Sequence, residues 1–134
     1  MTTEIVELTD GLLRLRAPNP GPMTFSGTNS YLLRGGSNHG LSLPRGVAVI
    51  DPGPNDERHL AALGEALGPA RVAAIMCTHT HRDHSPAAAP LSERTGAPIV
   101  GCAPLVLSSD LPRSDEAFDT TYAPDRVLAD GEAM

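Results

Sequence analysis

Short runs of apolar residues alternate with turn-forming residues along the first fifty positions. Ile5 to Leu8 and Leu12 to Arg16 are two such runs, and Asp10-Gly11 lies between them. Two strand-like runs joined by an Asp-Gly turn predict a β-hairpin. Asn29 to Arg34 and Val47 to Ile50 have the same character and predict a third and a fourth strand.

The pattern changes to a helical period after the fourth strand. Asn55 is placed to cap a helix with an acidic first turn, and Gly68-Pro69 ends this helix. Its apolar positions recur at helical spacing and form one stripe that faces a sheet: Leu60, Leu63 and Leu67. The next run, Val72 to Cys77, is continuously apolar, which is typical of a strand covered on both faces.

A second helix is expected between Ala88 and Gly96. If it began at Ser85, Pro90 would lie past the first turn and cost a backbone hydrogen bond, so the start is placed near Ala88. Pro98 to Gly101 then predicts another short strand.

The last predicted strand, Arg126 to Leu128, is followed by an Asp130-Gly131 turn. An antiparallel opening followed by alternating helices and strands indicates a mixed sheet with helices on one face. The predicted fold class is therefore α/β, or α+β by the order of elements.

Composition restricts the setting and the partners. The 134 residues suffice for one domain, and 16 acidic against 10 basic residues, all arginine, leave no basic run that would bind a nucleic-acid backbone nonspecifically. The amino-terminal residues lack a continuous apolar segment, so neither a signal peptide nor a membrane span is expected. Two cysteines, Cys77 and Cys102, are usually reduced in such a chain, which predicts a cytoplasmic location.

Four residues with metal-ligating side chains follow the run that ends at Cys77: His79, His81, Asp83 and His84. Because residues two apart in an extended segment project to one side, His79 and His81 can address one ion, while a turn lets Asp83 and His84 address a second. Imidazole with carboxylate suits zinc, and also iron, nickel or manganese. The alternative is a polar loop that only caps the next helix, but four ligand types at the end of a buried strand favour a metal site.

The segment His79 to His84 resembles the His-x-His-x-Asp-His signature of the metallo-β-lactamase superfamily. Three further segments resemble the branch near glyoxalase II and the lactamase-β-2-like enzymes, in the family's order: Gly27 to Leu32, Val49 to Gly53 and Thr95 to Pro98. This resemblance spans residues 5 to 134. It implies the amino-terminal half of a four-layer αββα sandwich with the metals at one edge of the sheets.

The resemblance also implies roles for individual residues. His79 and His81 would belong to the first metal site, and Asp83 and His84 to the second. Asp83 would in addition orient the attacking water and act in proton transfer as the catalytic residue. Asp51 resembles the family's strand-end aspartate, which orients the ligand loop without binding metal itself.

The chain departs from the family pattern at its carboxyl end. Family members add a third histidine, a bridging aspartate and a last histidine, but no histidine follows His84. The sequence therefore predicts one domain over residues 1–134 that is incomplete at its carboxyl end, with a shortened, inactive relative as the alternative. His39 and His59 lie upstream and are weak ligand candidates.

Three further features of the sequence have two interpretations each, and a fourth has one. Cys77 is either a nucleophile beside His79 or an inert buried thiol, and its apolar strand favours the inert thiol. Arg82 either contacts an anionic substrate or pairs with a carboxylate. Asn19 to Ser26 either overhangs the metal site or is only a surface loop, and Ser108 to Asp119 has the polar composition of a solvated connection.

These features predict a hydrolase that uses one or two Zn²⁺ ions, with Fe or Mn as alternatives, to activate water. The expected substrate is a small-molecule ester or thioester. RNA cleavage, a phosphodiester reaction of some lactamase-β-2-like enzymes, is disfavoured by the acidity and the few aromatic residues. From another class, the alternative is a noncatalytic metal- or partner-binding domain. A sheet face left open by a missing half also predicts a homodimer.

Overall fold

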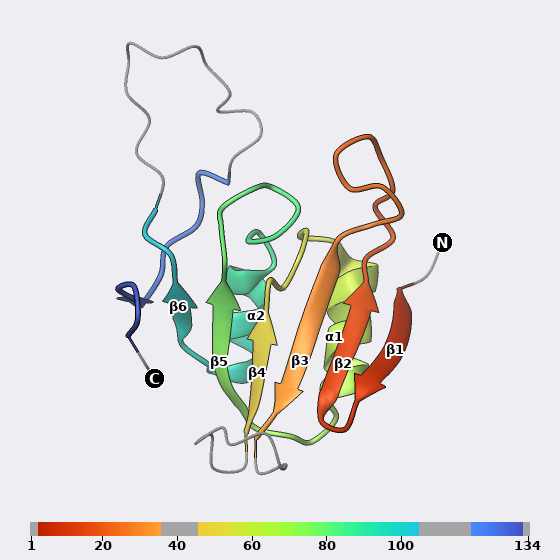
Figure 1. Ribbon diagram of the computed structural model, residues 1–134, viewed down its shortest axis with the longest axis horizontal. Helices are drawn as coiled ribbons and strands as arrows, with labels where there is room; N and C mark the ends of the chain where they lie inside the picture. The colour runs from red at the N-terminus through yellow and green to blue at the C-terminus, as the bar shows by residue number, and fades with distance from the viewer. Residues whose placement is uncertain (1–2, 36–45, 105–118, 133–134) are drawn as a thin grey trace.

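The computed structural model describes residues 3–35, 46–104 and 119–132. The strands and helices along these residues are β1 (Glu4–Thr9), β2 (Leu12–Arg16), β3 (Asn29–Arg34), β4 (Val47–Ile50), α1 (Glu57–Leu67), β5 (Val72–Cys77), α2 (Ala88–Thr95), β6 (Ile99–Gly101) and β7 (Arg126–Val127). The strands form one sheet, and their order in space follows their order in the chain (Figure 1).

The sheet is mixed, as the sequence predicts. The pairs from β1 to β4 are antiparallel, and those from β4 to β7 are parallel. Parallel neighbours need a crossover connection, which α1 provides between β4 and β5 and α2 provides between β5 and β6. The carboxyl ends of β4 and β5 consequently lie at the same edge of the sheet.

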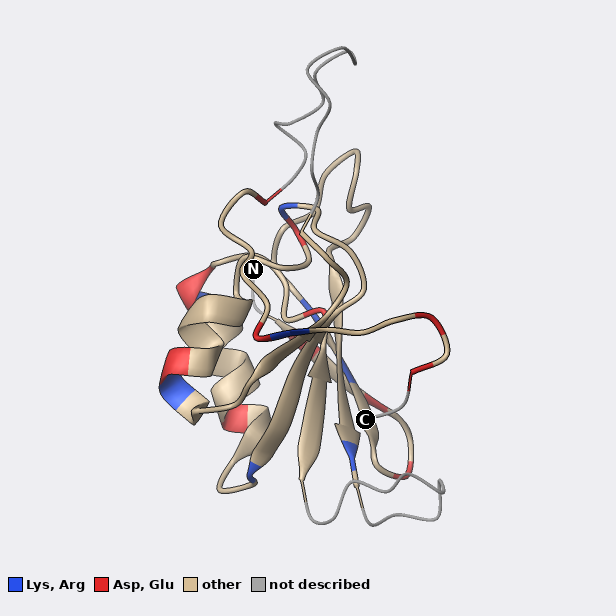
Figure 2. Ribbon diagram, turned by 90° about the vertical axis from the view of Figure 1, so that its left-hand side faces the viewer, with Lys and Arg blue, Asp and Glu red and all other residues tan. Residues whose placement is uncertain are grey.

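Both helices lie on one face of the sheet (Figure 2). The apolar stripe of α1 packs there against alternate residues of the strands. The core formed in this way includes Leu15, Leu32, Val49, Ile75, Leu60, Leu63, Leu67 and Leu91, all buried. Each buried leucine or isoleucine stabilises the fold by about 1.5–3 kcal/mol. The predicted α/β class, with helices on one face, is confirmed.

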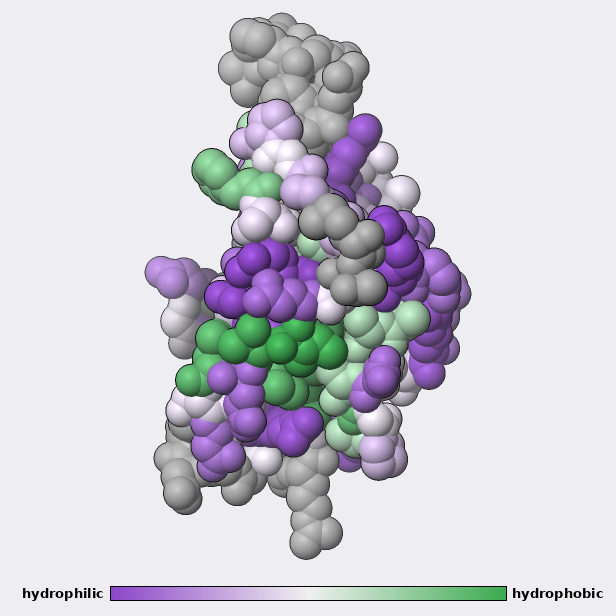
Figure 3. Space-filling model, turned by 90° about the vertical axis from the view of Figure 1, so that its right-hand side faces the viewer, coloured by the Kyte–Doolittle hydropathy of each residue, from purple (hydrophilic) through white to green (hydrophobic). Residues whose placement is uncertain are grey.

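The opposite face of the sheet carries apolar side chains that no described helix covers. Because strand residues alternate between faces, Leu33, Ile50 and Met76 point away from the helices, and each is half-buried. The sequence predicts that the run Val72–Cys77 is covered on both faces, whereas the described helices cover one. Figure 3 shows hydrophobic residues gathered on the side where β1 lies. Two side chains of β1 are each 46% exposed: Ile5 and Leu8.

The predicted ranges of helices and strands agree with the structure to within one residue, but the predicted helix cap is wrong. Asp56, not Asn55, caps α1, because the backbone of Asp56 is extended (φ −121°, ψ 124°) and its carboxylate accepts the N–H of Arg58 at 2.8 Å. Both residue types cap helices well, so the local backbone conformation decides between them.

Two sequence predictions concern residues outside the described ranges. One concerns His39, and the other concerns residues 108–118 of the predicted polar connection. Within the described ranges, no helix has the length and apolar character needed to cross a membrane.

Candidate metal centre

The sheet topology brings the ligand-type residues together. Asp51 follows β4 and the segment from Thr78 to His84 follows β5, so both start from the same sheet edge. The backbone N–H of Asp51 donates to the carbonyl of Met76 at 2.7 Å, which extends the pairing one residue beyond β4. Ligands at the carboxyl ends of parallel strands are the usual arrangement in open α/β sheets.

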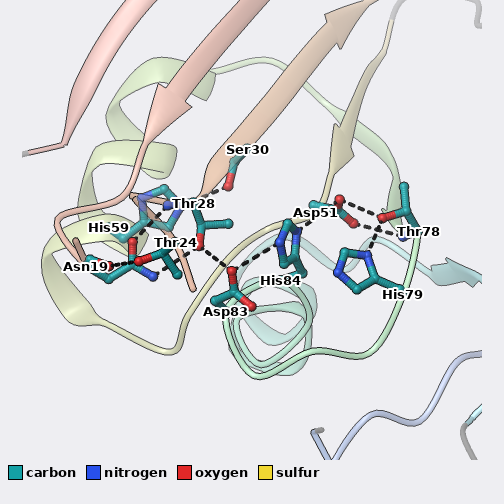
Figure 4. A network of polar contacts seen from close by, with 10 residues as sticks. All are labelled: Asn19, Thr24, Thr28, Ser30, Asp51, His59, Thr78, His79, Asp83 and His84. Carbon is teal, nitrogen blue, oxygen red and sulfur yellow. Dashed lines mark hydrogen bonds and ion pairs between the residues drawn. The ribbon is translucent and has the colours of Figure 1, made fainter. Parts of the chain in front are cut away.

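Asp51 is the polar centre of this edge. Its φ of 51° lies in the left-handed region, which is unfavourable for a residue with a side chain and is typical of functional turns. Its carboxylate accepts the N–H and hydroxyl of Thr78 at 2.8 and 2.7 Å, and lies 3.2 Å from Nδ1 of His84 (Figure 4). Burial alone would raise the pKa of Asp51, but hydrogen bonds from His84 and Thr78 outweigh it and lower the pKa.

Thr78 sets the orientation of His79. Its hydroxyl donates to Asp51 and therefore accepts from Nδ1 of His79 at 2.9 Å. This tautomer leaves Nε2 of His79 with its lone pair available for a metal. Burial, followed by the nearby charge of His84, lowers the pKa of His79 and favours the neutral ring that a metal requires.

His84 lies between two carboxylates. Its Nδ1 is 3.2 Å from Asp51, and its Nε2 is 3.1 Å from Oδ2 of Asp83. Burial alone would lower the pKa of His84, but the hydrogen bond to Asp51 and the charges of Asp83 and Asp51 raise it. When Nε2 of His84 carries a proton, it can donate to Asp83, and a cation bound at this place would replace that proton.

Asp83 is held from the other side by the β2–β3 loop. Its Oδ2 accepts the hydroxyl of Thr28 at 2.8 Å, and Asn19 in turn bonds both the hydroxyl and the N–H of Thr28 (Figure 4). The helix-capping alternative does not fit, because the N-cap of α2 is Ala87 and has no side-chain hydrogen bond.

The donor set fits a transition metal or zinc. Among the described residues, Asp51, His79 and His84 each offer a ligand atom, and these atoms lie within 4.8 Å of one another. The ring of His79 also contacts those of His81 and His84, with centroids 4.6 and 4.2 Å apart. Nitrogen donors with a carboxylate are the set that zinc prefers. The sequence predicts that His79 and His81 share one metal and that Asp83 and His84 share a second. This assignment stays a prediction, since the ring of His79 contacts those of both His81 and His84.

A cavity of about 320 Å³ adjoins these residues. The segment from His81 to His84 forms one wall, and Asn19, Met23 and Thr24 of the β2–β3 loop line the cavity with Pro54. Of the two readings of Asn19 to Ser26, the structure favours the loop that overhangs the site. Met23 and Phe25 are 82% and 84% exposed, so the loop presents apolar side chains to solvent.

Two other sequence candidates lie differently. Cys77 is buried at the end of β5, where burial raises the pKa of its thiol to about 12, so the protonated and inert form prevails. His59 is fully buried in α1, and its Nε2 lies 3.0 Å from the hydroxyl of Ser30, outside the ligand cluster. Arg82 is exposed and lines the cavity, which leaves its two predicted roles open.

Sequence reasoning missed the residues that support the ligands. Thr28 and Asn19 act across a separation of 55 or more positions from Asp83, and no spacing rule connects them. Thr78 could have been recognised as a supporting residue from the sequence, because it is a hydroxyl residue that follows a buried strand and directly precedes His79. The side chain of Ser30 points toward His59 (Figure 4). Nothing in the local sequence indicates this contact.

Comparison with known proteins agrees with this geometry. A family model described as the metallo-beta-lactamase superfamily matches residues 23–130. A beta-lactamase-like protein 2 homolog of Drosophila melanogaster is 37% identical over 83 residues, which are 60% of this chain and 26% of that protein. An atrochrysone carboxyl ACP thioesterase of Passalora fulva is 32% identical over 85 residues, 61% of this chain and 23% of that protein.

Solved structures share the fold. A mutant metallo-beta-lactamase from Cronobacter sakazakii gives a TM-score of 0.65 at 21% identity, over 96% of this chain and 48% of that one. A metallo-beta-lactamase from Novosphingobium pentaromativorans gives 0.59 at 30% identity, over 81% and 41%. The chain thus spans about a quarter of the curated relatives and less than half of these structures. By its family match over residues 23–130, the chain belongs to the metallo-beta-lactamase superfamily, whose members are generally metal-dependent hydrolases.

Proposed function

We propose that the protein is a metal-dependent hydrolase that acts on an ester or thioester, with one or two Zn²⁺ ions as cofactor. The observation that carries the proposal is the cluster at the edge of β4 and β5, where Asp51, His79 and His84 present ligand atoms within 4.8 Å beside an open cavity. Iron and manganese are the alternative cofactors, because imidazole and carboxylate donors also bind these metals.

The chain's own residues have separate tasks in this proposal. When bound, zinc supplies an activated water at neutral pH and polarises the oxygen of the substrate. The neutral imidazoles of His79, His81 and His84 would bind the metal. Asp51 lies among the same ligand atoms, but its carboxylate is bonded to Thr78 and His84 and would hold these residues in place. Asp83 lies between Thr28 and His84, where its carboxylate can bind the cation and accept or return a proton next to the cavity.

A thioester is the favoured substrate class. The thioesterase of Passalora fulva is 32% identical to this chain over 85 residues, and the β2–β3 loop adds the apolar Met23 to the cavity wall. RNA is the second candidate within enzymes and is less favoured, because the chain has a net charge of −6 and offers few aromatic residues for stacking. Free thiols at Cys77 and Cys102 support a cytoplasmic location.

The test is the substitution Asp83→Asn, which keeps the shape of the side chain and removes its charge. We expect Asp83→Asn to leave the melting temperature in place and to lower zinc affinity and thioester turnover by about 10- to 100-fold, as is common for groups that hold or orient a metal ligand. Metal content, melting temperature and hydrolysis of an acyl thioester and a short RNA are measured on the same preparations.

The matched control is Asp56→Asn, the same chemical change at the helix cap. It should alter none of the three quantities, because asparagine caps nearly as well as aspartate. Unchanged metal content and turnover in Asp83→Asn would remove the assignment of Asp83. Stable zinc binding without turnover of any substrate would favour the noncatalytic metal-binding domain instead.

A further inference from the structure

His59 is a polar side chain in an apolar position. It lies on the core-facing stripe of α1, with no exposed surface, beside Leu60 and Leu63. Its Nε2 lies 3.0 Å from the hydroxyl of Ser30 and its Nδ1 lies 3.3 Å from the hydroxyl of Thr3. A buried imidazole costs free energy unless its nitrogens are satisfied, so a leucine would serve packing alone equally well.

The ring of His59 lies directly against the turn that follows Asp51. A Cβ at Gly53 would lie 2.8 Å from Nε2 of His59 and 3.3 Å from the hydroxyl of Ser30, so only glycine allows this approach. The φ of 96° at Gly53 also favours glycine. Pro52, which precedes Gly53 in this turn, is fully buried.

The same turn holds the ligand loop from both sides. The N–H of Gly53 donates to the carbonyl of His84 at 2.8 Å, and the carbonyl of Gly53 accepts the N–H of Ala87 at 2.9 Å. His84 is therefore fixed twice, through its ring by Asp51 and through its backbone by Gly53.

We propose that His59 is a positioning residue for the metal centre: it fixes the Pro52–Gly53 turn and, through that turn, the backbone of His84. The contact chain runs from Ser30 of β3 to His59 of α1 (Figure 4), from His59 to the turn at Gly53, and from this turn to the ligand loop. Burial lowers the pKa of His59, so the ring is neutral and offers one donor and one acceptor. The effect of His59 on metal binding through His84 rests on the proposed function, whereas its contact with the turn does not.

Amide hydrogen exchange of Gly53 and Ala87 in the 134-residue chain tests whether His59 holds the Pro52–Gly53 turn. This measurement requires no metal. His59→Leu keeps the approximate volume and removes the hydrogen bonds; we expect exchange at these two amides to rise about tenfold more than at the core amides of β5. His59→Gln retains a donor and an acceptor and should restore protection. Leu67→Ala, on the same helix stripe but away from the turn, should lower core protection without singling out these amides.

If His59→Leu does not fold, Ser30→Ala carries the test, since it removes one partner of the ring and leaves the ring in place. Equal changes at the turn and at the core amides, or no rescue by His59→Gln, would overturn the proposal.

A second measurement addresses the metal, by Zn²⁺ titration against a competing chelator. We expect about tenfold weaker binding in His59→Leu and near-native binding in His59→Gln and Leu67→Ala, at the lower end of the range for orienting groups. Native affinity in His59→Leu would overturn the link to His84. A wild-type chain that binds no Zn²⁺ would count against a metal centre formed by these residues alone, while the exchange data would still decide the contact.

Discussion

At the scale of single residues, His59 and His84 respond to pH in opposite directions. Burial lowers the pKa of His59, whereas the carboxylates of Asp51 and Asp83 outweigh burial and raise the pKa of His84. A histidine with a lowered pKa contributes stability above its unfolded value of about 6.5, and this is lost as the pH falls. For His84 the sign is reversed: its contribution is present below about 6.5 and is lost as the pH rises through its raised pKa.

The pH dependence of His59 can be isolated with His59→Gln. The difference in unfolding free energy between wild type and variant should shrink as the pH falls from about 7.5 to about 5.5, by up to about 1.4 kcal/mol per pH unit. Chemical denaturation at several pH values measures this difference. The contributions of His79 and His84 to the pH dependence cancel in it, because both proteins contain these residues. A difference that stays constant across this range would show that His59 does not titrate on unfolding.

At the scale of elements, each helix is stabilised by its packing stripe and by its ends. α1 begins at the cap Asp56 and ends before Gly68, whose N–H donates to the carbonyl of Gly64 at 3.0 Å. α2 has no side-chain cap and ends at Gly96, which has a φ of 74°. Pro90 lies in the first turn of α2, where its missing N–H removes no helical hydrogen bond, as the sequence predicts.

The cap of α1 is tested by a pair of neighbouring substitutions. Asp56→Ala should destabilise the protein by about 1 kcal/mol, because it removes the acceptor for the N–H of Arg58. Asn55→Ala changes the residue that the sequence predicted as the cap, and it should leave stability unchanged. Thermal and urea unfolding of both variants measure the difference; an equal or larger loss in Asn55→Ala would contradict the observed cap.

At the scale of the whole molecule, the described helices cover one face of the sheet, and no described helix covers the other, which we call the open face. The open face carries Leu33, Ile50 and Met76 in adjacent strands, and contiguous apolar surfaces above a few hundred Å² usually bind a partner. The chain matches less than half of the length of the two superfamily structures. We propose that the isolated chain covers the open face with a second copy.

Self-association of the 134-residue chain is the expected outcome, measured by sedimentation at increasing concentration together with binding of a hydrophobic dye. Leu33→Lys places a charge on the open face and should shift the chain toward monomer. Ala61→Lys adds the same charge on the exposed side of α1 and should have no effect. A wild-type chain that stays monomeric and binds no dye would contradict an open apolar face.

The sequence by itself determined the elements and the ligand types. The apolar period of Leu60, Leu63 and Leu67 and the continuous run Val72–Cys77 depend on local spacing, so their ranges were predictable. The grouping of ligand-type side chains from His79 to His84 was likewise visible from local spacing, and its role as a metal site stays a prediction. The local sequence did not distinguish Asn55 from Asp56 as the cap, because both are good capping residues and the backbone angles decide.

Only the tertiary structure decided which residues meet. Parallel pairing of β4 and β5 brings Asp51 to Thr78 and His84, and the β2–β3 loop brings Thr28 to Asp83, across separations of 27 to 55 positions. No periodicity in the chain encodes such contacts, because they depend on strand order and on where each strand ends. The same holds for His59: its spacing is that of an ordinary core position, and only the packing of α1 against the turn at Gly53 brings it next to the segment that follows Asp51.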